Sequence, residues 1–123
     1  MTTLELQSPS KAKKFFDQKV AFTTGPVELS HMINERHEIV VVDVREAEDY
    51  EKGHIPGAIN CPKSKWEFCD GLSKDKNNIV YCYTQTCHLA AWAALEFADN
   101  GYPVLEMEGG FAAWKESGLP IEQ

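Results

Sequence analysis

The 123-residue sequence lacks several features that would place it in a specialised class of protein. No stretch approaches the roughly 20 consecutive apolar residues that a membrane-spanning helix needs. Residues 1–6 contain neither a basic nor an apolar segment, so we expect no signal peptide. Positive charge is scarce as well, because 12 Lys and Arg face 19 Asp and Glu, for a net charge of −7. Nucleic acids and anionic membranes bind basic surfaces, and we therefore expect neither as a partner.

Cysteine is sparse, and its spacing excludes further classes. The four cysteines are Cys61, Cys69, Cys82 and Cys87, and neither Cys61 nor Cys69 has a close-spaced partner in the sequence. Since no export signal is predicted, we expect a cytoplasmic protein with mostly reduced thiols and no disulfide framework. Four residues separate Cys82 from Cys87, whereas c-type haem attachment needs two, and no second Cys/His cluster follows His88. We therefore expect no metal and no cofactor.

Short apolar runs alternate with helical patterns along the chain. Residues 39–44 and 78–82 are rich in Val and Ile and nearly free of polar side chains, which is typical of strands buried on both faces. Shorter strands are predicted at residues 58–61 and 104–107. Helices are predicted at residues 8–20, 47–52, 64–68 and 88–100. Two more are predicted, one beginning after Thr24 as its cap and one beginning after Gly109 and Gly110. This alternation predicts an α/β fold with a central parallel sheet and helices on both faces.

The chain shows no linker, internal repeat or low-complexity tract, so we predict one domain over residues 1–123. Its core is expected at about residues 25–121. Residues 1–24 are expected to form an N-terminal helical extension. This extension either covers the edge of the sheet or meets a partner, and of the two we expect it to cover the edge. The oligomeric state is not predicted.

The segment from Cys82 to His88 is the strongest candidate for chemistry. It joins a buried strand to an alanine-rich helix, which puts Cys82 at the tip of the strand, in a loop whose backbone N–H groups converge on it. The helix that follows presents its positive N-terminal end. We expect these groups to lower the pKa of the Cys82 thiol below about 8.5, the usual value for free cysteine. The thiolate is the nucleophilic form, so Cys82 is the predicted nucleophile.

Four segments together resemble the rhodanese-like family. They are residues 42–46 (VDVRE), 53–60 (GHIPGAIN), 81–82 (YC) and 108–114 (EGGFAAW), and their order and spacing match the family from about Gly25 to Ile121. The resemblance implies a rhodanese-like fold and a sulfurtransferase. In such a protein a small sulfane-sulfur donor loads the loop cysteine as a persulfide, and a thiol or protein acceptor receives the sulfur. The residue that matches the catalytic cysteine is Cys82.

The resemblance also assigns the rest of the loop to substrate binding: Tyr83, Thr84, Gln85, Thr86, Cys87 and His88. Many active family members carry a basic residue, usually arginine, five positions after the cysteine. Here that position is Cys87, and no Lys or Arg occurs between Lys76 and Lys115. A guanidinium binds oxyanions bidentately, so its absence predicts weak use of thiosulfate. The related phosphatases with a Cys-x5-Arg loop need an arginine at the next position, which is His88 here, and we expect no phosphatase activity.

Two loop residues leave alternatives open. Cys87 either resolves an adduct on Cys82 by forming a disulfide, as in a thiol–disulfide redox protein, or packs structurally beneath the loop. The disulfide would require Cα atoms within about 7 Å. His88 either donates a hydrogen bond to a bound anion or simply fills the start of the helix. The missing arginine also motivates a third interpretation, a catalytically silent rhodanese fold used as a binding or regulatory module.

Three further residues are possible supporting groups. Arg45 is expected to form a buried ion pair with a carboxylate such as Asp43 rather than to face the active site, because an unpaired buried charge costs several kcal/mol. His54 lies in a Gly/Pro turn and is expected to hydrogen-bond the local backbone. Five large aromatic residues are expected in the core: Trp66, Phe68, Trp92, Phe111 and Trp114. Of these, Trp66 and Phe68 are also expected near the rim of the active site.

Overall fold

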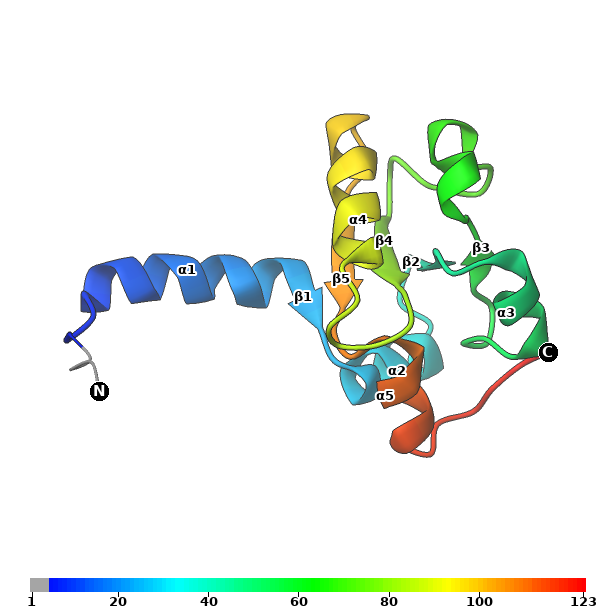
Figure 1. The fold of residues 1–123 in the computed structure, drawn as a ribbon, viewed down its shortest axis with the longest axis horizontal. Helices are drawn as coiled ribbons and strands as arrows, with labels where there is room; N and C mark the ends of the chain where they lie inside the picture. The colour runs from blue at the N-terminus through cyan, green and yellow to red at the C-terminus, as the bar shows by residue number, and fades with distance from the viewer. Residues whose placement is uncertain (1–4) are drawn as a thin grey trace.

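The computed structural model describes residues 5–123, which fold around a five-stranded, all-parallel sheet (Figure 1). The strands, in their order across the sheet, are β1 (Thr23–Thr24), β5 (Val104–Met107), β4 (Asn77–Tyr81), β2 (Ile39–Asp43) and β3 (Ile59–Asn60). The helices are α1 (Pro9–Phe22), α2 (Pro26–Asn34), α3 (Ala47–Lys52), the 3-10 helix η1 (Lys63–Phe68), α4 (Leu89–Asp99) and α5 (Gly110–Glu116). The predicted α/β class, parallel sheet and N-terminal helix are confirmed.

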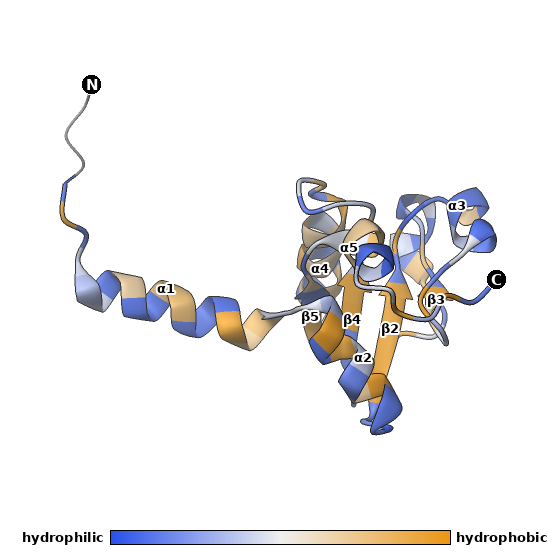
Figure 2. Cartoon of the chain, turned by 90° about the horizontal axis from the view of Figure 1, so that it is seen from below, coloured by the Kyte–Doolittle hydropathy of each residue, from blue (hydrophilic) through white to orange (hydrophobic). Residues whose placement is uncertain are grey.

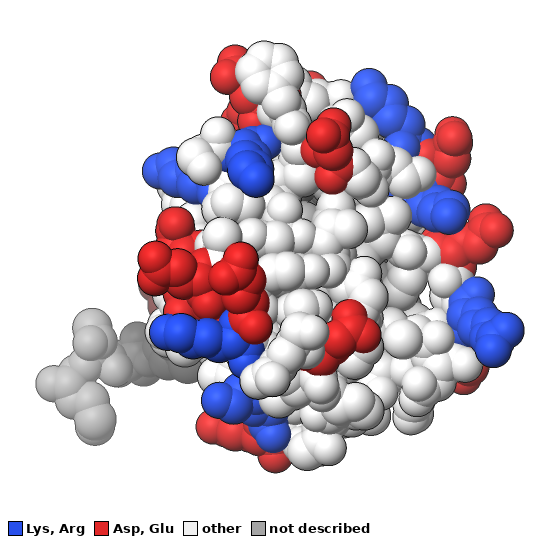
Figure 3. Space-filling model, turned by 90° about the vertical axis from the view of Figure 1, so that its right-hand side faces the viewer, with Lys and Arg blue, Asp and Glu red and all other residues white. Residues whose placement is uncertain are grey.

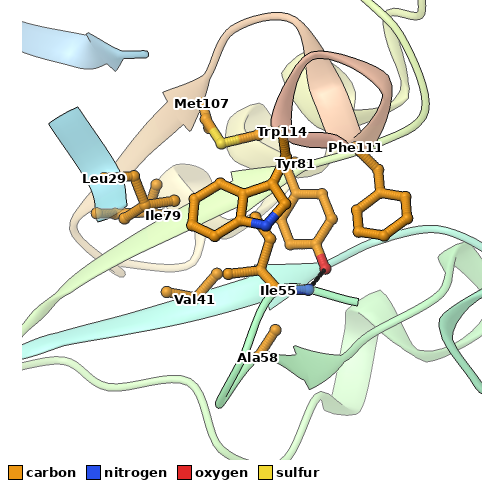
Figure 4. Close-up of a cluster of buried hydrophobic side chains, with 9 residues drawn as sticks. All are labelled: Leu29, Val41, Ile55, Ala58, Ile79, Tyr81, Met107, Phe111 and Trp114. Atoms are coloured by element: carbon orange, nitrogen blue, oxygen red, sulfur yellow. Dashed lines mark hydrogen bonds between the residues drawn. The ribbon is translucent and has the colours of Figure 1, made fainter. Parts of the chain in front are cut away.

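The central strands divide their side chains between two cores, one on each face of the sheet. Val41, Ile79 and Tyr81 point towards α2 and α5, where they join a cluster that includes Trp114 (Figure 4). The alternate positions, which include Val80 and Cys82, face α4 and η1 on the opposite side. Successive strand residues point to opposite faces, so this division follows from the registers of β2 and β4. The Cys82 side chain therefore belongs to the α4 side of the sheet.

Two elements at the start of the domain differ from the prediction. Residues 23–24, where no strand is predicted, pair in parallel with β5 as the edge strand β1. Thr24 consequently does not cap α2, whose N-cap is Gly25 without a side-chain hydrogen bond. A strand of two residues is too short for a pattern of alternating polarity. The strand forms because it pairs with β5, and a pairing with a distant segment cannot be predicted from the local sequence pattern.

Helix α1 projects away from the body of the molecule (Figures 1 and 2), so the prediction that it covers the sheet edge is wrong. None of its residues 9–22 is buried, and Phe15, Phe16 and Val20 are each more than half exposed. A salt bridge of 3.3 Å joins Lys19 of α1 to Glu108. The helix runs directly into β1, and that strand sets its direction away from the sheet.

The predicted aromatic core is confirmed in part. Phe111 and Trp114 are buried, and Trp66 packs partly buried against the second core. Trp92 and Phe68, however, are 62% and 83% exposed, so the prediction is wrong for them. Trp92 lies on the outward face of α4. This helix carries apolar residues on its exposed face as well as on the face that is buried.

Cys61 and Cys69 form a disulfide across η1, with their Cα atoms 6.0 Å apart. The expectation of reduced thiols without a disulfide is therefore wrong for this pair. Eight positions separate the two residues in sequence, and the tight 3-10 turn brings the chain back on itself over that distance. The indole N–H of Trp66 donates to the Cys61 carbonyl oxygen at 3.0 Å and fixes the same turn.

Within residues 5–123, no helix is long and apolar enough to cross a membrane. On the face shown in Figure 3, Lys and Arg side chains lie scattered among Asp and Glu, and one group of acidic side chains is prominent. This mixture is in keeping with the net charge of −7.

Candidate active site

The loop between β4 and α4, residues 82–88, borders a cavity of about 280 Å³ at the carboxyl end of the sheet. Ligands of open α/β sheets bind outside the carboxyl ends of the strands, so the position suits a binding site. The loop and the end of β5 together line the cavity with Cys82, Thr84, Gln85, Cys87, His88, Ala91, Glu106, Met107, Glu108 and Gly109. Five of the seven predicted loop residues thus meet at one cavity.

Cys82 is almost fully enclosed, with 2% of its surface exposed. Its thiol donates a hydrogen bond to the carbonyl oxygen of Cys87 at 3.3 Å. Burial, followed by the interaction with the Cys87 side chain, raises the pKa of Cys82 to about 11. The backbone N–H groups of Ala90 and Tyr83 act in the opposite direction but do not compensate. The prediction of an easily ionised Cys82 is therefore wrong, because the converging N–H donors are outweighed by loss of water.

Cys87 is the more readily ionised thiol of the loop. Burial works to raise its pKa, but hydrogen bonds from the Leu89 backbone N–H, the Cys82 side chain and the backbone N–H groups of Tyr83 and Thr84 outweigh it. The pKa of Cys87 consequently lies below its ordinary value. Its side chain is partly exposed and lines the cavity. The loop therefore pairs a buried thiol that resists ionisation with a partly exposed neighbour that ionises more readily.

The start of α5 holds the loop in place. The backbone N–H of Phe111 donates to the Cys82 carbonyl oxygen at 2.8 Å, and that of Ala112 donates to the Tyr83 carbonyl oxygen at 3.0 Å. Gly110 permits this approach, because a Cβ at its position would lie 2.6 Å from the carbonyl carbon of Tyr83. Gly110 also has a φ of 65°, in the left-handed region that favours glycine. The second glycine of the EGGFAAW segment is thus a contact point of the loop.

Tyr83 braces the loop from the opposite direction. Its hydroxyl donates to the Asp49 carboxylate at 2.6 Å and accepts from the backbone N–H of Glu46 at 3.1 Å. Both partners lie at the start of α3, so the ring spans from the loop to the neighbouring strand–helix connection. Tyr83 and Thr86 do not line the cavity. Tyr83 therefore braces the loop from outside the cavity.

Two carboxylates form the wall opposite the loop, and sequence reasoning missed both. Glu106 and Glu108 lie at the end of β5, the parallel neighbour of β4, and therefore reach the same edge of the sheet. Burial, and then the nearby Glu108 carboxylate, raise the pKa of Glu106, while His88 opposes the shift. The strand order would have been the signal for these residues. Their negative charge makes the cavity unfavourable for a dianion.

The three predicted supporting residues lie behind the site and do not line the cavity. Arg45 forms the buried ion pair expected from the sequence, with 2.8 Å between its Nη2 and an Asp43 carboxylate oxygen. The Tyr81 hydroxyl donates to the same carboxylate at 2.7 Å. A ring nitrogen of His54 lies 2.8 Å from the Tyr50 carbonyl oxygen, the kind of local backbone contact expected for it. These groups fix the ends of β2 and β4 on which the loop is built.

A larger cavity of about 440 Å³ lies elsewhere, beside η1. Its lining includes Trp66, Phe68 and the disulfide-bonded Cys69, and neither free cysteine borders it. The structure thus places Trp66 and Phe68 at this second cavity rather than at the rim of the Cys82 site. Across residues 5–123, no group of three or more His, Cys, Asp or Glu side chains is arranged to hold a metal ion.

Comparison with known proteins gives consistent matches over most of the chain. The family model of the rhodanese-like domain matches residues 25–117. The thiosulfate sulfurtransferase GlpE of Actinobacillus succinogenes is 33% identical over 106 residues, which cover 84% of this chain and 93% of that protein. An HTH-type transcriptional regulator of Mycobacterium tuberculosis is 37% identical over 92 residues. That match covers 72% of this chain, and the chain spans only 40% of the regulator's length.

Among solved structures, the BH2092 protein of Bacillus halodurans superimposes with a TM-score of 0.86 at 36% sequence identity. The superposition covers 94% of this chain and 86% of that one. The match therefore extends beyond residues 25–117 and takes in part of the sequence outside the family model.

Proposed function

Because the chain belongs to the rhodanese-like family, we propose that it is a sulfurtransferase or sulfur carrier that moves sulfane sulfur through a persulfide on Cys82. The observation that carries the proposal is the position of Cys82. Its thiol ends a central strand, borders a cavity of about 280 Å³, and lies among the backbone N–H groups of the loop. Backbone donors arranged in this way stabilise the anionic sulfur of a persulfide.

In the loading step, the Cys82 sulfur attacks the terminal sulfane sulfur of a donor. A new sulfur–sulfur bond forms, the donor's own bond to that sulfur breaks, and the leaving group departs with the electron pair. Cys82 must lose its proton to water for this attack. The raised pKa of Cys82 makes loading slow at neutral pH and gives a strongly nucleophilic sulfur once the proton has left.

The cavity wall bears on the choice of donor. Thiosulfate is a dianion, and the loop has no arginine to bind it. Glu106 and Glu108 add negative charge on the opposite wall, and the salt bridge from Lys19 to Glu108 offsets only part of it. We therefore propose a donor that carries less negative charge than thiosulfate, such as an organic persulfide or thiosulfonate. The glutamine double variant Glu106→Gln/Glu108→Gln should use thiosulfate faster than the wild type, whereas unchanged turnover would contradict this role of the wall.

Intact-mass measurement tests the function. The Cys87→Ser protein, incubated with thiosulfate or an aryl thiosulfonate, is expected to gain one sulfur atom. The matched double variant Cys82→Ser/Cys87→Ser should gain none, and Cys69→Ser/Cys87→Ser should behave like Cys87→Ser. If Cys87→Ser gains no sulfur from either donor, the proposed persulfide on Cys82 is refuted.

A second candidate function, a thiol–disulfide redox protein, is favoured by the direct interaction between the two loop thiols. It predicts that mild oxidation removes two free thiols and yields a peptide in which Cys82 and Cys87 are linked. Oxidation of Cys82 to a sulfinic acid with Cys87 unmodified would exclude this candidate.

Three wider expectations stay predictions. Cell fractionation tests the cytoplasmic location, and a gel-shift assay with duplex DNA and RNA tests the expectation that nucleic acid is not a partner. Limited proteolysis tests whether residues 1–123 behave as one domain.

A further inference from the structure

The second thiol of the loop has no role in the loading step. We propose that Cys87 is an internal acceptor, which attacks the Cys82 persulfide and releases the sulfane sulfur as hydrogen sulfide. This inference rests on the proposed function, since it begins from the persulfide on Cys82. It makes the protein a sulfide-releasing enzyme that consumes an external dithiol.

The geometry favours Cys87 over any external acceptor. Both cysteines line the same cavity, and the Cys82 sulfur lies 3.3 Å from the Cys87 carbonyl oxygen. The Cys87 backbone N–H donates to the Thr84 carbonyl oxygen at 3.2 Å, so the chain turns back within the loop. The two thiols lie close enough to interact directly. An external acceptor must instead reach a residue that is only 2% exposed.

The chemistry of the two sulfur atoms decides where Cys87 attacks. Attack on the outer sulfur of the persulfide would expel the Cys82 thiolate, and attack on the inner sulfur would expel hydrosulfide. The less basic group leaves faster in such exchanges. Hydrogen sulfide ionises near neutrality, whereas burial and the Cys87 side chain raise the pKa of Cys82 to about 11. Hydrosulfide is therefore the better leaving group, and the inner sulfur is the site of attack.

The step balances without an added reagent. The Cys87 sulfur forms a bond to the inner sulfur and its proton passes to the outer sulfur. The bond between the inner and outer sulfurs breaks, and the outer sulfur leaves as hydrosulfide with the electron pair. The two cysteines are oxidised to a disulfide, and the sulfane sulfur is reduced by two electrons. An external dithiol then restores both thiols by thiol–disulfide exchange. It attacks at the Cys87 sulfur, which is the exposed side of the bond.

The test is a single turnover without reductant. Full-length wild-type protein and the Cys87→Ser, Cys87→Ala and Cys69→Ser variants are pre-reduced and desalted. They are then mixed with an aryl thiosulfonate, whose leaving group is a sulfinate and not sulfide. Released sulfide and intact mass are followed over time, with free thiol kept at micromolar concentration. A neighbouring thiol acts at an effective concentration of about millimolar or more. Release from the wild type should therefore be on the order of 100-fold faster than release from Cys87→Ser.

The outcomes separate this inference from the proposed function. The inference is supported if the wild type releases one sulfide per chain and forms a Cys82–Cys87 disulfide. Both Cys87 variants should keep a stable persulfide, and Cys69→Ser should behave like the wild type. If the wild type keeps its persulfide and releases sulfide no faster than Cys87→Ser, internal acceptance is overturned while the proposed function stands. If no protein gains sulfur or releases sulfide, the proposed function itself has failed, and the inference with it.

Discussion

Replacing Gly110 with alanine should disturb the active-site loop from a residue that does not line the cavity. Gly110 begins α5 with a φ of 65°, and an added Cβ would lie 2.6 Å from the Tyr83 carbonyl carbon and from the Thr84 backbone nitrogen. Both contacts are with backbone, so the loop or the helix must move. The hydrogen bond from Phe111 to the Cys82 carbonyl oxygen lies at the same junction and would move with it.

The expected loss of stability has two parts. A left-handed backbone conformation costs an alanine about 1–2 kcal/mol. Forcing extra volume into a filled site costs about 1–3 kcal/mol more. Gly118 provides a matched control, because it has a φ of 69° and nothing within 4 Å of an added Cβ. Gly118→Ala should pay only the first cost. Gly110→Ala should therefore be the less stable of the two variants by about 1–3 kcal/mol.

Urea unfolding of the wild type and the two variants measures this difference. Alkylation of the loop thiols in native protein should also change in Gly110→Ala and stay at the wild-type rate in Gly118→Ala. If the two variants unfold at the same urea concentration and react alike, the close approach between α5 and the loop does not hold the site, and the reasoning is refuted.

Three more predictions concern cysteines and one tyrosine. Iodoacetamide at neutral pH should label Cys87 before Cys82, because the pKa of Cys82 is raised to about 11 and that of Cys87 is lowered. Labelling of Cys82 should rise only in strongly alkaline buffer, and peptide mapping that finds Cys82 labelled first would contradict this order. Tyr81→Phe removes a hydroxyl that donates to a buried carboxylate at 2.7 Å and accepts from a backbone N–H at 3.1 Å, so it should cost about 1–3 kcal/mol in urea unfolding. Reduction of the Cys61–Cys69 disulfide should cost about 2–3 kcal/mol, since the bond closes a short loop with a separation of 8 residues. A variant with alanine at both positions should show no such dependence on reductant.

The parts of the fold that were predicted correctly are those with strong local patterns. The continuous Val and Ile runs located β2 and β4, and the alanine-rich segment after the loop located α4, each close to its observed bounds. Edge strand β1 and the direction of α1 were not predictable in this way. Both depend on pairing with β5, which lies some eighty residues further along the chain.

The sequence predicted the loop that lines the site, but not the pKa of Cys82 or the acidic residues on the opposite wall. Position at a strand end led to the Cys82 loop, and the structure gathers most of that loop at one cavity. The direction of the Cys82 pKa was wrong, because the sequence reveals nearby N–H donors but not how much water the fold excludes. Glu106 and Glu108 were missed for a related reason. Their place at the site follows from β5 lying beside β4, and strand order is not written in local sequence.

Helix α1 gives the molecule a part whose folding is largely separate from that of the core. None of its residues 9–22 is buried, and an isolated helix of fewer than about 12–15 residues is only marginally stable in water. Its backbone amides should therefore exchange with deuterium far faster than those of β4, and urea should melt it before the sheet. Since α1 exposes almost no new surface when it unwinds, it adds little to the denaturant dependence of global unfolding. Far-ultraviolet circular dichroism would register its loss, while the buried Trp114 continues to report an intact core.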